Sequence, residues 1–334
     1  MGGYGRDMEK KGATEKNVIH RLFTFEGKVS HQIKLLGAFV LMCFIFSMLS
    51  PNYLTASNLL NVLRQASTLF MLAFGQTLVL LIAGIDLSQG SVLGLVSVVT
   101  SLGLIHFGFV PGILGGLLTG SLCGLVCGVV ISKAKVPDFV VTLGMMFIAE
   151  GIALVITDGQ PVFGFPSEVA NKFFLIGGGY VGIVPIPVIL SVAALIFFYK
   201  YLKLTRFGRH IYAIGGNEEA AHLSGIQVDR RKITVYALNG FLVAVGSLIL
   251  TSRVNSGQPL LGGGYLMESI GAVVIGGTSL FGGRGGVLQT SLGVCFVAFM
   301  VNGLNLLGIS TFIKEILIGV LMIVAVLVSV QRGR

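Results

Sequence analysis

The feature that most constrains this chain is a long stretch without charge. Between Asp86 and Lys133 the sequence contains no Asp, Glu, Lys or Arg. A water-soluble fold would have to bury all of it, whereas a bilayer accepts apolar helices of about 20 residues. Only 11% of all residues are charged, less than half of the roughly 25% found in soluble domains. The chain is therefore expected to be an all-α integral membrane protein.

Apolar runs recur along the chain and predict a polytopic bundle of about ten transmembrane helices. A basic tail over 1–32 precedes a membrane domain over 33–330, and 331–334 form a second tail. The turn at 84–90 and the segment at 253–265 are each compatible with burial inside the bundle or with exposure to water. The predicted spans are 33–49, 68–84, 90–108, 111–131, 139–157, 185–200, 233–251, 266–281, 287–306 and 312–330.

The distribution of basic residues predicts the orientation. With the N-terminus inside, the outer segments hold only Arg64, Lys172, Arg253 and Lys314 of the 23 Lys and Arg residues. Cytoplasmic loops of membrane proteins carry an excess of Lys and Arg. Both termini are therefore expected in the cytoplasm, with the first helix uncleaved. The net charge of +9 is explained by orientation, so no nucleic-acid partner is expected.

Small residues predict how the fourth span packs. A glycine at every fourth position forms one helical stripe, typical of a face packed tightly against another helix. The four cysteines lie in apolar runs and are interpreted as small buried hydrophobes, so no metal site is expected. The glycines of the stripe are Gly112, Gly116, Gly120, Gly124 and Gly128.

The longest inner loop, 201–232, carries helix signals. Asn217 is expected to cap a short helix that begins at Glu218 with an acidic first turn. Gly225 is expected to end it about two turns later. Such a helix offers a rigid attachment for another protein, and the alternative is a solvated connector. The predicted docking residues are Gly215, Gly216, Asn217, Glu218, Glu219, Ala220, Ala221, Ser224 and Gly225.

The string GGNEEAAHLSGI at 215–226 resembles the cytoplasmic coupling segment of permease subunits in bacterial ABC importers for ribose, xylose, arabinose and related simple sugars. Other strings agree with this family in the same order, and the resemblance covers about 35–330. They are AGIDLSQGS at 83–91, VPDFVVTLG at 136–144, SGQP at 256–259, VIGGTSL at 274–280 and NGLNLL at 302–307.

The resemblance implies a multi-pass permease of the bacterial cytoplasmic (inner) membrane that imports a ribose-like monosaccharide. Its implied partners are an ABC ATP-binding subunit, an extracytoplasmic sugar-binding protein, a second permease copy as a homodimer, and membrane lipid. No cofactor and no catalytic residue are implied, because the partner subunit binds ATP. The sequence agrees in lacking a Gly-x4-Gly-Lys-Ser/Thr phosphate loop. On this hypothesis, closure of the ATPase pushes the 215–226 segment and tilts the bundle.

The alternative is a secondary transporter or channel that works alone. Such a carrier would normally bury several paired ionisable groups, and the candidates here are Glu150 and, at the start of the eighth span, Glu268. A membrane-embedded enzyme is poorly supported, because the five His residues do not fall in a metal-binding or catalytic spacing.

Polar residues in or near the spans are candidates for the sugar path, and hydrogen bonding between helices is the alternative for each. At position 150 the resemblance predicts Arg, whereas this chain has Glu, so no family role is carried over there. Asp86 is expected to be structural, capping the next helix. The candidate pathway residues are Asn61, Gln65, Gln76, Thr142, Glu150, Asn239, Glu268, Asn302 and Asn305.

Overall fold

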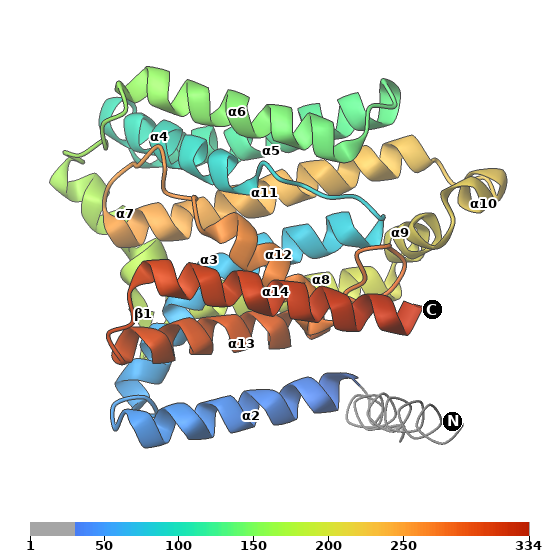
Figure 1. Ribbon diagram of the computed structural model, residues 1–334. Helices are drawn as coiled ribbons and strands as arrows, with labels where there is room; N and C mark the ends of the chain where they lie inside the picture. The colour runs from blue at the N-terminus through green and yellow to red at the C-terminus, as the bar shows by residue number, and fades with distance from the viewer. Residues whose placement is uncertain (1–30, 334) are drawn as a thin grey trace, which may run out of the picture.

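The computed structural model describes residues 31–333. Most of the long helices run roughly side by side, with α6 along one side, α2 along the other, and α3, α11 and α12 between them (Figure 1). β1 and β2 pair as an antiparallel hairpin. The elements are α2 (His31–Leu49), α3 (Ala56–Leu81), α4 (Gln89–His106), α5 (Phe109–Lys133), α6 (Asp138–Thr157), α7 (Ser167–Gly178), β1 (Tyr180–Val181), β2 (Val184–Pro185), α8 (Ile186–Leu204), α9 (Arg206–Gly216), α10 (Glu218–Leu223), α11 (Val228–Val254), α12 (Tyr265–Gly276), α13 (Val287–Leu306) and α14 (Thr311–Gly333).

Each of the ten predicted spans overlaps a helix, in agreement with a polytopic helical membrane protein. In the described part of the chain, seven helices are long and apolar enough to cross a membrane, namely α2, α4, α5, α6, α8, α11 and α13. α12 differs, because its 12 residues make a helix about 18 Å long, short of a hydrocarbon core of about 30 Å. The predicted span 266–281 is therefore too long, and the count of ten full crossings stays a prediction.

Several boundaries differ from the sequence prediction. The sequence places the second span at 68–84, whereas α3 begins at Ala56. The first turns of α3 carry polar side chains that resemble a connector in sequence. Residues 1–30 of the predicted tail over 1–32 lie outside the described part of the chain, and α2 already begins at His31. At the other end, α14 continues through most of the predicted tail at 331–334.

The glycine stripe on α5 packs as predicted. A β-carbon at Gly120 would lie 2.6 Å from the carbonyl oxygen of Gly240 on α11, and one at Gly124 would overlap the carbonyl oxygen of Tyr236. Toward the other end of α5, a β-carbon at Gly112 would meet Leu104 of α4. Glycine, whose side chain is a single hydrogen atom, thus lets α5 approach α11 and α4 this closely.

Two non-helical segments lie inside the bundle, at 82–88 before α4 and at 255–264 before α12. In the first, Asp86 is only 3% exposed. The second runs along α4, where the backbone N–H of Gln258 donates to Ser97 Oγ at 3.2 Å, and Gly262 packs against Gly90. Both of the segments that the sequence left open between water and the bundle therefore pack against it along part of their length, while Ile85 and Leu260 stay exposed.

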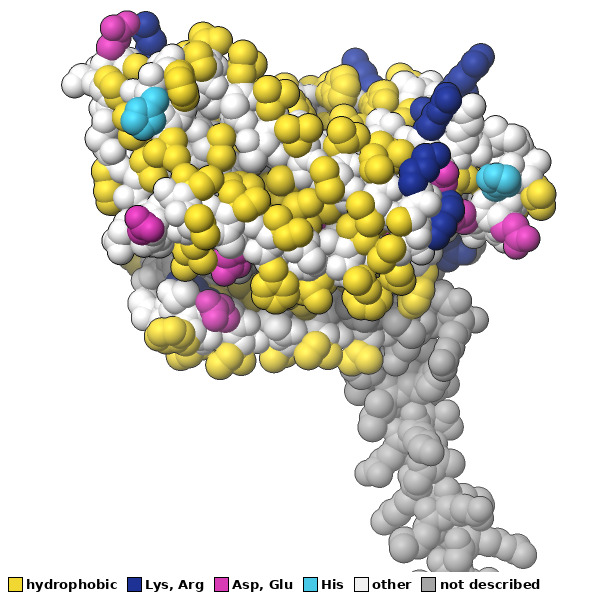
Figure 2. Space-filling model, turned by 90° about the horizontal axis from the view of Figure 1, so that it is seen from above, with side chains coloured by type: hydrophobic (Ala, Val, Ile, Leu, Met, Phe, Trp, Pro, Cys, Tyr) yellow, Lys and Arg dark blue, Asp and Glu magenta, His cyan; other side chains and the backbone are white. Residues whose placement is uncertain are grey.

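The surface agrees with a membrane location. Hydrophobic side chains cover the broad middle of the face in Figure 2, whereas most of the Lys and Arg side chains gather at one end. Leu118 of α5 and Phe147 of α6 are 60% and 65% exposed. Exposed apolar side chains of this size over long helices are expected where lipid is the solvent. α9, α10 and the end of α14 lie at the same end of the bundle (Figure 1).

Candidate functional site

The short helix in the 201–232 loop forms where the sequence predicts it. Asn217 Oδ1 accepts a hydrogen bond from the backbone N–H of Ala220 at 2.9 Å, and α10 runs from Glu218 to Leu223. Gly225 follows with φ +82°, a conformation that favours glycine. Within α10, Ala221 is the one buried residue. The rest of the helix surface is exposed at the end of the bundle, where another protein can reach it.

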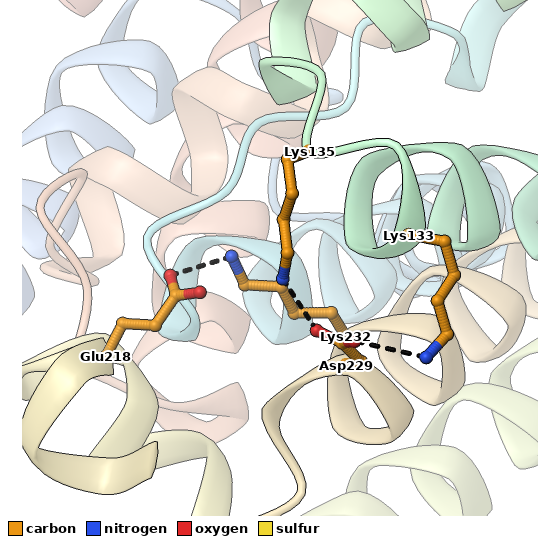
Figure 3. Close-up of polar contacts among 5 residues, drawn as sticks. All are labelled: Lys133, Lys135, Glu218, Asp229 and Lys232. Atoms are coloured by element: carbon orange, nitrogen blue, oxygen red, sulfur yellow. Dashed lines mark hydrogen bonds and ion pairs between the residues drawn. The ribbon is translucent and has the colours of Figure 1, made fainter. Parts of the chain in front are cut away.

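Ion pairs connect this region to the long helices (Figure 3). Glu218 Oε2 of α10 lies 2.7 Å from Lys232 Nζ of α11. Asp229, in the first turn of α11, lies between Lys133 Nζ at 3.1 Å and Lys135 Nζ at 2.8 Å. The start of α11 is thus tied both to α10 and to the end of α5.

α9 also connects α10 to the bundle, and sequence reasoning gave no sign of this contact. A β-carbon at Gly215 would overlap the carbonyl oxygen of Leu81, the last residue of α3. The backbone N–H of Gly283 donates to that same carbonyl at 3.0 Å, and Tyr212 Oη donates to the carbonyl oxygen of Gly285 at 2.7 Å. The end of α9 therefore packs against the end of α3 and the turn before α13.

A basic group surrounds His210 on α9. Partial burial and the neighbouring guanidinium groups of Arg231 and Arg209 lower the pKa of His210 from its ordinary value of 6.5. Arg231 also lies over the ring of Phe207, with its guanidinium carbon 5.8 Å from the ring centre. The neutral imidazole is favoured here because protonation would add a further positive charge to this group.

Four of the nine candidate pathway residues meet at one cavity of about 220 Å³ between α3, α12 and α13. We call it the α3–α13 cavity. Asn302 exchanges two hydrogen bonds with Asn58, at 2.9 and 3.1 Å. Asn305 Oδ1 accepts a hydrogen bond from Lys314 Nζ. The four candidates in its lining are Gln65, Glu268, Asn302 and Asn305.

A fifth candidate, Glu150, lines a separate cavity of about 310 Å³. We call it the α4–α6 cavity, since α4, α6, the 255–264 segment and the start of α12 form its walls. Ser91 Oγ, in the first turn of α4, donates to Glu150 Oε2 at 3.2 Å. Sequence reasoning missed Ser91, although its place just after the Gly-Ile-Asp-Leu-Ser string put it near a predicted span end.

Asn239 is buried away from both cavities and belongs to a polar network. Its Nδ2 donates to Asp86 Oδ2, and its Oδ1 accepts from Gln89 Nε2 at 2.7 Å. Gln89 Oε1 in turn accepts from Ser269 Oγ of α12 at 2.8 Å. Asp86 Oδ1 accepts from the N–H and the Oγ of Ser88. Asp86 thus makes structural contacts, but the predicted cap is wrong, because Ser88 occupies the N-cap of α4.

The three remaining candidates line neither of these two cavities. Thr142 is buried and donates to the carbonyl oxygen of Asp138 at 2.9 Å within α6. Gln76 is fully buried on α3, and neither of its amide atoms has a hydrogen-bond partner among the described residues. Asn61 is exposed and accepts from Arg64 at 2.8 Å. The Asn61 contact lies within α3, whereas Thr142 also donates to the carbonyl oxygen of Ile85 at 3.4 Å and so links α6 to the segment before α4.

One exposed residue of α10 was missed by sequence reasoning. Leu223 is 81% exposed, and it stands at the end of a helix that is otherwise small or polar. A lone apolar residue in a polar loop gives no signal in sequence, because only the structure shows whether its side chain is buried or exposed. Elsewhere, no three His, Cys, Asp or Glu side chains of residues 31–333 come together in a group that could hold a metal ion.

Comparison with known proteins gives a consistent result. Residues 58–326 match the family model described as branched-chain amino acid transport system / permease component. The ribose import permease protein of Bacillus subtilis (strain 168) is 43% identical over 322 residues, which is 96% of this chain and 98% of that protein. Its Escherichia coli (strain K12) counterpart is 41% identical over 96% of this chain and 99% of that protein. The L-arabinose transport system permease protein of E. coli (strain K12) is 37% identical, over 91% and 92%. No solved structure matches the chain.

Proposed function

The chain belongs to the family of permease components described for the branched-chain amino acid transport system, and we propose that it carries a ribose-like monosaccharide. It is a non-catalytic permease subunit of an ABC sugar importer in the bacterial inner membrane. The family description names amino acids, but relatives matched over nearly their whole length are ribose and L-arabinose permeases. Full-length identity above 40% to ribose permeases is the observation that carries the proposal.

A permease of an ABC import system works with an ATP-binding subunit and a substrate-binding protein. We propose that two copies of the chain form the pore in the lipid bilayer, and that ATP is bound by the partner subunit, with no cofactor on this chain.

The proposed coupling site is the α10 region, with residues 215–221, Ser224 and Gly225. Its exposed, capped helix supports this role, since a rigid element transmits a push better than a flexible loop. The Glu218–Lys232 ion pair and the contact of Gly215 with Leu81 offer routes by which a displacement of α10 reaches α11 and α3.

The proposed sugar path includes the nine polar candidates, and the cavities give unequal support. Gln65, Asn302 and Asn305 present amides and Glu268 a carboxyl to the α3–α13 cavity, and Glu150 lines the α4–α6 cavity. These groups can exchange hydrogen bonds with sugar hydroxyls. Asn239 and Thr142 are buried and line neither cavity, so the support for a sugar contact is weaker there.

Reconstitution tests the function. Proteoliposomes that contain this permease, its ATP-binding subunit and its sugar-binding protein should take up D-ribose only with ATP. Replacing Glu219 or Gly225 by Trp should abolish uptake while the protein stays inserted and folded. Uptake by the permease alone would instead support a secondary transporter or channel.

A further inference from the structure

The α4–α6 cavity combines features that do not suit a surface in contact with lipid. Its walls include Glu150 of α6, the first turn of α4 at Gly90 and Ser91, and the non-helical backbone of 259–263. Glu150 lies twelve residues from the start of α6, or about 18 Å along the helix axis. This places its carboxyl well inside a hydrocarbon core of about 30 Å.

The backbone at this depth also needs polar surroundings. Leu260 and Gly263 are exposed in the non-helical segment before α12. Non-helical backbone occurs at membrane depth only where protein covers it or where it lines a water-filled cavity. Gly262 packs so closely on Gly90 that its β-carbon would overlap the Gly90 carbonyl oxygen, so backbone rather than side chains closes this part of the cavity wall.

The charge of the cavity restricts what it can hold. Glu150 accepts a hydrogen bond from Ser91 at 3.2 Å, and no Lys or Arg is among the lining residues. Within the described part of the chain, Glu150 makes no ion pair. A carboxyl without a basic partner is an intramembrane functional candidate. Its free oxygen can accept a hydrogen bond from a hydroxyl, whereas the lining offers no Lys or Arg to an anion.

The size is compatible with a small solute. The volume of about 310 Å³ lies at the lower end of the range for small-molecule pockets, which is about 300–1,000 Å³. Apolar groups such as Met146, Leu260 and Leu266 line it together with the polar side chains of Ser91 and Glu150. A mixed lining of this kind suits the apolar and hydroxyl faces of a sugar and permits weak binding.

We propose that the α4–α6 cavity is a water-filled transit site for neutral polyhydroxylated solutes, at which the Glu150 carboxyl, positioned by Ser91, accepts hydrogen bonds from solute hydroxyls. The inference rests on the proposed sugar import and assigns one step of it to a defined place. Glu268 and the α3–α13 cavity lie on the other side of the first turn of α12, so they provide a separate site.

Water access is tested without relying on transport. Met146 lines the cavity one helical turn before Glu150, and Leu118 provides a lipid-facing control on α5. M146C and L118C are treated with a charged, membrane-impermeant methanethiosulfonate in proteoliposomes, with and without ATP and vanadate. Labelling is quantified for each peptide by mass spectrometry, so the native cysteines stay in place. M146C should react at least about tenfold faster than L118C in one of the two states, and D-ribose should slow it. If M146C reacted no faster than L118C in either state, the proposal would be overturned.

The role of the carboxyl is tested by two substitutions of similar size. E150L removes hydrogen bonding, and maximal D-ribose uptake should fall about tenfold or more, because a hydroxyl would lose its polar partner. E150Q keeps an acceptor and should stay within about threefold of wild type. F147L, on the lipid-facing side of the same helix, is the control. If E150L took up D-ribose at the wild-type rate, the transit role of Glu150 would be excluded, but ATP-driven uptake by the complex would still support the proposed function. A wild-type complex without ATP-driven uptake would instead contradict the proposed function itself.

Discussion

Asn239 of α11 donates a hydrogen bond from Nδ2 to the carboxyl of Asp86, which lies in the non-helical segment between α3 and α4. Both residues are buried, and the described residues show no ion pair to Asp86. The same amide accepts a hydrogen bond from Gln89. One side chain therefore fixes both the segment before α4 and the first residue of α4. A β-carbon at Gly75 would overlap Asn239 Oδ1, so α3 packs directly on this amide.

Replacing Asn239 by Leu should destabilise the protein. N239L keeps the size of the side chain but leaves Asp86 and Gln89 each without one partner, at a cost of about 1–3 kcal/mol for buried polar groups. Thermal unfolding in detergent can be followed with a thiol-reactive dye, because Cys127 is fully buried. N61L is the matched control, since Asn61 is exposed. Equal melting temperatures for N239L and wild type would contradict this role.

The sequence predicted the helical fold well because each span is a long apolar run, and lipid demands such runs regardless of tertiary contacts. It failed where tertiary contacts decide. The polar first turns of α3 read as a loop, yet Asn58 pairs with Asn302 from α13, 244 positions away in the chain. α12 was predicted too long because Leu280 and Phe281 were counted with the apolar run that precedes them, while Gly277, with φ +100°, ends the helix.

The candidate site was predicted in parts. Asn217, Glu218 and Gly225 were found because capping and termination are local and leave a sequence signal. The pairing of Glu218 with Lys232 and the packing of Gly215 on Leu81 depend on how α9 folds back, which no local pattern encodes. Similarly, polar residues in spans could be named, but only the packing of the helices separates Glu150, at a cavity, from Asn239, in the interior.

Gly215 and Gly216 should differ in their tolerance of alanine. A β-carbon at Gly215 would overlap the carbonyl oxygen of Leu81, whereas one at Gly216 meets no atom within 4 Å. G215A should therefore displace α9 from the end of α3 and lower the sugar imported per ATP hydrolysed. G216A should stay close to wild type, because alanine is small enough for docking. The ratio of uptake to phosphate release in proteoliposomes measures this, and equal ratios for the two variants would argue against coupling through the α9–α3 contact.

Reversing the charge of either Glu218 or Lys232 should impair ATP-driven uptake, and exchanging the two charges should restore it. Lys232 is only 15% exposed on its side chain, so K232E places two carboxylates together at a partly buried position and should weaken the attachment of α10. The double variant E218K/K232E restores opposite charges, and an ion pair of this exposure is worth up to about 1 kcal/mol. ATP-driven uptake of both single variants and the double variant forms the cycle. If uptake by the double variant were no faster than uptake by K232E, the ion pair would not be the contact that attaches α10 to α11.

His210 should make the cytoplasmic end less stable in mild acid. Partial burial and the guanidinium groups of Arg231 and Arg209 hold the pKa of His210 below 6.5 in the folded protein. Above about pH 6.5 His210 is neutral in both the folded and the unfolded protein, so it has no effect on stability. As the pH falls from that value through the lowered pKa, protonation favours the unfolded protein and stability is lost. H210Q should show a smaller drop in melting temperature between about pH 7.5 and pH 5.5 than wild type. An equal drop in both proteins would assign the acid sensitivity to other groups.

Leu223 should act as an apolar anchor for the ATP-binding subunit. It is 81% exposed at the end of α10, away from the helices that lipid would cover, so water surrounds it until a partner binds. Burying a leucine contributes about 1.5–3 kcal/mol, and L223A should therefore weaken binding of the ATP-binding subunit by about tenfold or more. L204A, at the end of α8, is the control, because Leu204 is similarly exposed at 68% but lies outside α10. Affinity is measured by titrating the labelled ATP-binding subunit into the permease in nanodiscs. If L223A binds as tightly as L204A, docking uses the polar face of α10 instead, and Glu219 becomes the residue to test.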